Sequence, residues 1–236
     1  MDFTPLLHAE WIKIRTLRSQ LGALAAILLA TVAFSVLATA DADGADPLFS
    51  VFCGISFGQV AAIAFGTTAM SCEFRGGALR LTLSAAPDRP RWFAAKATAV
   101  ALPTLAVGLL TGLVTLLLGR AALGASTPGW AEGLRGAVGC GLHLTLMALF
   151  ATGLTAVLRS GVATLSVLVP FLLIVSFVVG DLSGGAADFL PDRAGQVALH
   201  SAWHGALGPW SGLAVTALWA TAALLAGAWS LHRRDA

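Results

Sequence analysis

The side chains that could do chemistry in this chain are few, and their spacing does not form a catalytic set. There is no G-x-x-x-x-G-K-[ST] phosphate loop, and Gly76-Gly77 lacks the lysine that such a loop needs. Zincin and G-x-S-x-G motifs are also missing. Ser201 lies near His204, but such a pair is expected by chance in a loop, and the three cysteines lack the spacing of a metal site. We therefore predict no catalytic residue, metal or cofactor in this chain.

Charged residues are rare and unevenly spaced, which indicates a membrane protein. They make up 11% of the 236 residues, against roughly 25% in a soluble domain, and the mean hydropathy is +0.84. Six stretches without Asp, Glu, Lys or Arg are each long enough for the roughly 20 residues that cross a bilayer. We predict one all-α integral membrane domain, residues 1–236, with spans at approximately 19–40, 48–72, 95–119, 136–158, 161–180 and 210–231.

The distribution of basic residues predicts the orientation. If the N-terminus is cytoplasmic, eleven of the fourteen Lys and Arg residues fall on the cytoplasmic side, and only Arg120, Arg135 and Arg193 fall outside. Cytoplasmic loops of membrane proteins carry such an excess of Lys and Arg. We therefore predict a multi-pass protein of the cell membrane with both termini in the cytoplasm.

The segment before the first span is predicted to be a helix that lies on the inner membrane surface. Thr4-Pro5 has the form of a helix start, with Thr4 as N-cap and Pro5 at the first helical position. We predict the helix over residues 4–17, with an apolar stripe of Phe3, Leu7, Trp11 and Ile14 that Glu10 and Arg18 interrupt. The alternative is a plain cytoplasmic extension of the first span.

The cytoplasmic loop at residues 73–91 is predicted to present a short two-faced helix, which Pro87 and Pro90 end. A two-faced helix suits docking to a partner, whereas a solvated loop would account for the arginines but not for the apolar face. Helical spacing predicts a polar face with Glu73, Gly77, Arg80 and Ser84, and an apolar face with Phe74, Ala78, Leu81 and Ala85.

The longest external segment, residues 181–209, is Gly-rich at first and then amphipathic, so we predict short helices on or in the outer leaflet.

Inside the spans, small residues recur four positions apart (Gly58, Ala62 and Gly66, then Gly108 and Gly112), which lets helices approach closely. Pro103 and Pro170 are predicted to kink their spans.

No acidic or basic residue lies well inside a predicted span, and this bears on the energy source. Ion-coupled carriers usually place such residues at mid-membrane. Here only His143, Gln59 and scattered Ser and Thr are available, and His143 could face a pathway or bond to a neighbouring helix. We expect any driving force to come from another chain.

Three parts of the chain carry motifs of a known family. They are the loop motifs Glu73-Phe-Arg-Gly, Arg80-x-Thr82, Ala85-Ala-Pro87-x-Arg89-x-Arg91 and Ala94-Ala-Lys96, the N-terminal Ala9-Glu-Trp-Ile-Lys13-x-Arg15-Thr-x-Arg18-Ser, and the external Leu190-Pro-x-x-Ala194-Gly-Gln196. With these motifs the sequence resembles the type-2 (export) class of ABC transporter permeases, in its actinobacterial form. Family members typically show Glu-Tyr-Arg-His-Gly in the cytoplasmic loop, where this chain has Phe74 for Tyr and Gly76 for His. The resemblance covers essentially the whole chain.

The resemblance implies a permease that moves a hydrophobic or amphipathic substrate with energy from a separate ABC ATPase. Two ATPase copies, which hold ATP and Mg, would pair with two permease subunits in the lipid. We expect the permease subunits to form a homodimer, with a heterodimer as the alternative, and no nucleic acid partner is implied. An interfacial elbow helix would carry Trp11, Lys13 and Arg15. In the coupling helix Glu73, Arg75 and Arg80 would contact the ATPase, Phe74 and Leu81 would pack that helix, and Leu190, Pro191 and Gln196 would belong to the external cap.

Two other functions stay open on the sequence alone. One is a membrane protein without transport activity, such as a sensor, assembly or immunity factor, and the other is an intramembrane enzyme. The sequence selects neither the substrate nor the residues that line a pathway, because lipid-facing and pathway-facing sides are alike in their small apolar side chains.

Overall fold

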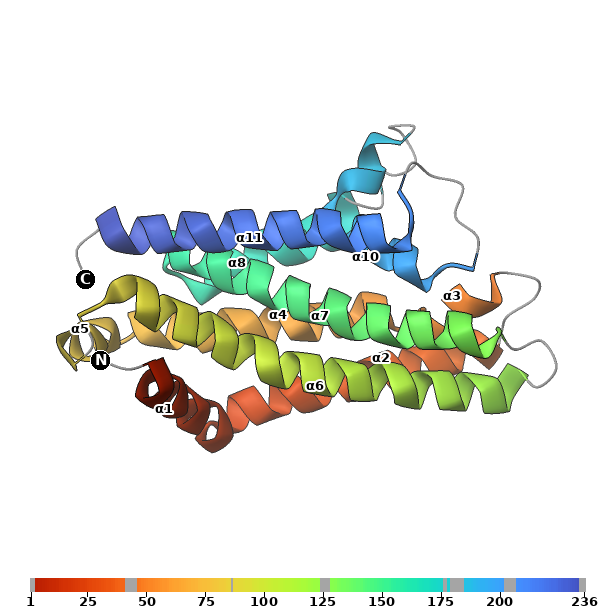
Figure 1. The fold of residues 1–236 in the computed structure, drawn as a ribbon, viewed down its shortest axis with the longest axis horizontal. Coiled ribbons are helices and arrows are strands. Elements are labelled where there is room, and N and C mark those ends of the chain that lie inside the picture. Colours follow the sequence, from red (N-terminus) through yellow and green to blue (C-terminus); the bar gives the residue numbers. More distant parts are fainter. Residues whose placement is uncertain are drawn as a thin grey trace.

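The fold is a bundle of long helices that run side by side (Figure 1). The computed structural model describes residues 3–40, 46–85, 87–123, 128–175, 178, 185–201 and 207–233, and these residues contain no strand. The long helices are α2 (Arg18–Ala40), α4 (Ile55–Ser71), α6 (Arg89–Leu123), α7 (Trp130–Leu158) and α11 (Pro209–Arg233). The short α3 (Pro47–Phe52) precedes α4, and the 3-10 turn η1 (Cys72–Phe74) follows it.

Among the described residues, five helical segments are long and apolar enough to cross a membrane: Arg18–Thr39, Pro47–Phe74, Arg89–Leu123, Trp130–Leu158 and Pro209–Arg233. They correspond to five of the six predicted spans. In the predicted span at 161–180, the described part consists of α8 (Gly161–Pro170) followed directly by the π-helical turn η3 (Phe171–Val175). Beyond Val175 most of that span lies outside the described residues.

The two prolines for which kinks are predicted both lie within helical segments. The helix changes from α to π directly after Pro170. Pro103 lies inside α6, whose helical assignment continues on both sides of it.

Close helix contacts in the bundle depend on glycines, as the fourfold spacing of small residues predicts. At Gly66 on α4 a Cβ would overlap the carbonyl oxygen of Ala148 on α7. At Gly112 on α6 it would overlap the backbone of Ala137, also on α7. The central helix α7 therefore meets α4 and α6 backbone to backbone.

Two polar side chains inside the bundle, His143 and Gln59, contact each other across two helices. His143 on α7 is fully buried, and its Nε2 lies 3.0 Å from Oε1 of Gln59 on α4. Of the two alternatives for His143, the structure therefore has the one in which it bonds to a neighbouring helix.

Helix α1 (Phe3–Thr16) is separate from α2 and lies at an angle across one end of the bundle, where it packs on α6 and α2 (Figure 1). This favours the predicted separate helix at 4–17 over a straight extension of the first span. The short α5 (Ala78–Ala85) and the last turns of α11 lie at the same end, whereas α3 and α10 (Pro191–Gln196) lie towards the other (Figure 1).

The segment predicted to be external contains short helical turns where it is described: η4 (Ala186–Phe189), α10 and η5 (Val197–Leu199). Pro191 occupies the first turn of α10, and its carbonyl accepts a 2.8 Å hydrogen bond from Oγ1 of Thr216 on α11. Pro191 is buried, while Leu190 and Gln196 are half-buried. These three residues therefore lie in or beside a helix that packs on the end of the bundle.

A carboxylate and an imidazole fasten this segment to α3. Asp46 caps α3, and its Oδ2 lies 3.2 Å from Nδ1 of His200 and accepts a 2.8 Å hydrogen bond from the backbone N–H of Ser201. The His200 ring stacks on Phe49 with centroids 4.3 Å apart, and Arg135 donates to the His200 carbonyl at 2.7 Å. Burial lowers the pKa of His200 below its ordinary value, although the Asp46 charge raises it in part.

We expect acid to loosen this end of the protein. Because the folded state lowers the pKa of His200, the unfolded chain binds a proton that the folded chain does not, and stability falls as the pH drops below about 6.5. Burial alone would raise the pKa of Asp46, but hydrogen bonds from the Ser201 hydroxyl and from the backbone N–H groups of Ser201, Phe49 and Leu48 outweigh it and lower that pKa, so Asp46 stays ionised in this range. Thermal unfolding at pH 7.5 and 5.5 should show the loss, and the variant His200→Asn should reduce it. An unchanged pH dependence in that variant would contradict the assignment.

Candidate functional site: a buried charge cluster beside α5

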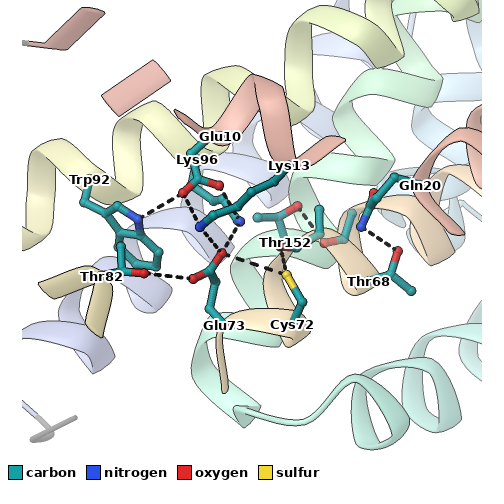
Figure 2. Close-up of polar contacts among 12 residues, drawn as sticks. Glu10, Lys13, Gln20, Thr68, Cys72, Glu73, Thr82, Trp92, Lys96 and Thr152 are labelled. Atoms are coloured by element: carbon teal, nitrogen blue, oxygen red, sulfur yellow. Dashed lines mark hydrogen bonds and ion pairs between the residues drawn. The ribbon is translucent and has the colours of Figure 1, made fainter. Parts of the chain in front are cut away.

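Four charged side chains from three parts of the chain meet at the end of the bundle that carries α1 and α5 (Figure 2). Lys96 Nζ lies 2.6 Å from Glu10 Oε2 and 2.6 Å from Glu73 Oε1. Lys13 Nζ lies 2.8 Å from Glu10 Oε1 and 2.8 Å from the same Glu73 oxygen. We call these four residues the charge cluster; it contains two positive and two negative groups.

The charge cluster is inside the protein. Glu10, Glu73 and Lys96 are each 2–3% exposed, and only Lys13 reaches the solvent-accessible surface. A buried charge is tolerated when it is paired and hydrogen-bonded, because desolvation otherwise costs several kcal/mol per ion. Burial alone would lower the pKa of Lys13, but hydrogen bonds to Glu10 and Glu73 outweigh it and raise that pKa, so Lys13 remains cationic.

Local helix geometry brings the four groups together. Glu10 and Lys13 are three residues apart on α1 and therefore share a face, on which Glu10 and Ile14 are buried. Lys96 lies one helical turn after Trp92 on α6, and both side chains are buried. Glu73 lies in the 3-10 turn that follows α4, so the end of α4 delivers its carboxylate.

Neutral donors complete the coordination of the two carboxylates. Trp92 Nε1 lies 3.4 Å from Glu10 Oε1, and Thr82 Oγ1 lies 3.4 Å from Glu73 Oε2 (Figure 2). Thr82 belongs to α5, so the charge cluster connects α5 with α1, with the end of α4 and with α6.

Helix α5 is attached to the bundle by one apolar face. Leu79 is 5% exposed and Leu83 is half-buried, and they pack with Met70, Trp92, Phe93, Ala156 and Leu231. The opposite side is open, with Leu81 73% exposed and Arg80 and Ser84 also exposed.

The predicted apolar face of this helix was therefore wrong at Leu81. The spacing argument assumed one continuous helix from Glu73, but Gly76 and Gly77 have φ of +61° and +75°. These left-handed conformations suit glycine and break the helical register before Ala78. The new helix places Leu79 and Leu83 inward instead of Leu81.

The residues expected to contact an ATPase differ in how far they are buried. Glu73 is buried in the charge cluster, so in this conformation it presents no surface for a direct contact. Arg75 and Arg80 are exposed. Phe74 is half-buried, with the Arg159 guanidinium 5.9 Å from its ring centroid. A pocket of about 420 Å³ opens beside α5, and its lining includes Phe74, Arg80 and Arg159.

The three residues predicted for the elbow helix lie in two different environments. Trp11 and Arg15 are exposed on α1, whereas Lys13 is held in the charge cluster. Two members of the cluster, Glu10 and Lys96, were missed as site residues. The available signal for Glu10 was a carboxylate that interrupts the apolar stripe of a short helix, and for Lys96 it was a lysine at the edge of a charge-free stretch.

The ion pairs of the charge cluster are suited to holding helices together. Its carboxylates are saturated by lysines, and among the described residues no three His, Cys, Asp or Glu side chains are grouped to hold a metal ion. No protein-family model matches this chain, and no curated protein sequence matches it. The geometry of the site therefore carries the functional argument.

Proposed function

We propose that this chain is the permease subunit of an ATP-driven exporter of the type-2 ABC class, and that α5 is its docking site for a separate ATPase. The observation that carries this proposal is the attachment of α5. It presents an exposed face to a partner while Leu79, Leu83 and the Thr82–Glu73 contact bind its other side to the bundle. A displacement of α5 is thereby passed to α1, α4 and α6 through the charge cluster.

A six-span topology is part of this proposal. The N-terminal α1 and the last turns of α11 lie at the same end of the bundle (Figure 1). If these two ends lie on the same side of the membrane, the chain crosses it an even number of times, which supports a sixth crossing beside the five long helices. The segment from Gly161, which contains α8 and the π-helical turn, is the candidate. We place both termini and α5 in the cytoplasm, on the side favoured by the excess of basic residues.

The proposal assigns energy and transport to different chains. The ATPase subunits, in two copies, would hold ATP and Mg, while two copies of this chain would form the path for a hydrophobic or amphipathic substrate. We assign the contact with the ATPase to three exposed side chains, Arg75, Arg80 and Leu81. Glu73 lies on the buried side of α5 and holds this helix by accepting the hydrogen bond from Thr82.

We expect the double variant Arg80→Glu/Leu81→Glu to lose binding to the ATPase. Replacing a charged and an apolar contact at the centre of an interface commonly costs more than 2 kcal/mol, which corresponds to at least about 30-fold weaker binding. The measurement is co-purification with the ATPase from a neighbouring gene, together with ATP hydrolysis by the reconstituted complex.

The control is Arg18→Glu, which makes the same charge change as Arg80→Glu alone, on an exposed residue of α2. It should leave the complex intact. Full binding and full stimulation of ATP hydrolysis in the α5 variant would show that the ATPase docks elsewhere, whereas no binding by the unaltered chain would favour a membrane protein without transport activity.

A further inference from the structure

A second feature lies on the other side of α1, away from the charge cluster. Where α1 crosses α6, an open groove of about 500 Å³ lies between them. Its α6 wall is formed by Leu102, Pro103 and Ala106, and its α1 wall includes Trp11. Two polar side chains, Thr4 and His8, also face it. The groove is thus mainly apolar with hydrogen-bonding groups along one edge.

The position of the groove along α6 indicates its surroundings. Leu102 and Ala106 follow Lys96 by six and ten residues, which at 1.5 Å per residue places them about 9–15 Å beyond the charge cluster. They belong to a helix that is long and apolar enough to cross a membrane. In the proposed membrane orientation the groove therefore opens at the depth where lipid headgroups give way to acyl chains.

The charge on α1 determines which lipid fits. Glu10, the acidic residue of this helix, is neutralised by Lys13 and Lys96, so the exposed charge of α1 is positive. Arg15 is exposed and lies two helical turns beyond His8, on the same face as His8 and Trp11. Cationic side chains beside the cytoplasmic leaflet attract anionic headgroups, and Trp is favoured at the interface.

We propose that this groove is a binding site for an anionic phospholipid of the inner leaflet. One acyl chain lies along Leu102 and Ala106, and the phosphate and ester groups meet His8 and Arg15. A free phosphate ion would leave the apolar wall unused, and a neutral lipid would leave Arg15 unmatched. The site rests on the proposed membrane location of the chain and does not require an ATPase or transport activity.

The test compares phosphatidylglycerol with phosphatidylcholine on the purified chain, by native mass spectrometry of retained lipid. We expect tighter retention of phosphatidylglycerol. Arg15→Gln should weaken that preference by about five-fold, the effect of one basic residue near an anionic surface. Ala106→Phe should abolish retention of both lipids at this site, because the ring occupies the groove.

Ala122→Phe is the matched control, since Ala122 is also exposed on α6 but lies far from α1. It should retain lipid like the unaltered chain. Equal retention of the two lipids by the unaltered chain, or unchanged retention in Ala106→Phe, would overturn the proposal. Because the assay contains no ATPase, its result is independent of the exporter proposal.

Discussion

Lys96→Met is expected to lower the free energy of unfolding by about 3–5 kcal/mol, the usual cost of breaking a buried ion pair by removing one partner. Lys96 is 3% exposed and lies 2.6 Å from both Glu10 and Glu73. Methionine fills a similar volume but leaves two buried carboxylates to share Lys13. Equilibrium unfolding in detergent micelles, followed by a helix signal, would measure the loss.

The control for this variant is a second substitution. The double variant Lys96→Met/Glu73→Gln removes one charge of each sign, so it should recover a large part of the loss. Arg91→Met breaks an exposed pair, 3.0 Å from Asp88, and should change stability by less than about 1 kcal/mol. If Lys96→Met costs no more than Arg91→Met, the charge cluster does not hold α1, α4 and α6 together.

Gly66→Ala is expected to cost about 1–3 kcal/mol, the range for added volume at a well-packed contact. The new Cβ would overlap the Ala148 carbonyl, and Thr152 Oγ1 already donates to the Gly66 carbonyl at 3.3 Å. Neither neighbour can move without shifting α7 against α4. The same unfolding measurement applies.

Gly22→Ala is the matched control, since a Cβ there has no neighbour within 4 Å and the residue is exposed on α2. Alanine favours a helix over glycine by about 1 kcal/mol, so this variant should be neutral or more stable. Equal losses in Gly22→Ala and Gly66→Ala would indicate that the α4–α7 contact is looser than the structure describes.

The long helices could be predicted from the sequence because the apolar character of successive residues adds up along each of them. A stretch of twenty residues without a charge can be recognised without knowing which residues pack against it. Five such stretches correspond to helices long enough to cross a membrane. The stretch at 160–180 carries the same signal, but the π-helical turn after Pro170 interrupts its α-helix.

The arrangement around α5 could not be predicted in the same way. Its register depends on φ at Gly76 and Gly77, and residue spacing contains no information about a left-handed turn. The charge cluster depends on pairing across 86 residues between Glu10 and Lys96. A single sequence indicates that each charge is unusual, but it does not indicate which charges meet.

The same separation has a consequence for how the protein is made. Synthesis delivers Glu10 and Lys13 first, then Glu73, and Lys96 only after the second long segment is complete. Glu10 has Lys13 as an early partner, but its second lysine and the Trp92 donor arrive more than eighty residues later. The first helix therefore reaches its final position only when the start of α6 has entered the bundle, which makes α6 the element that completes the charge cluster.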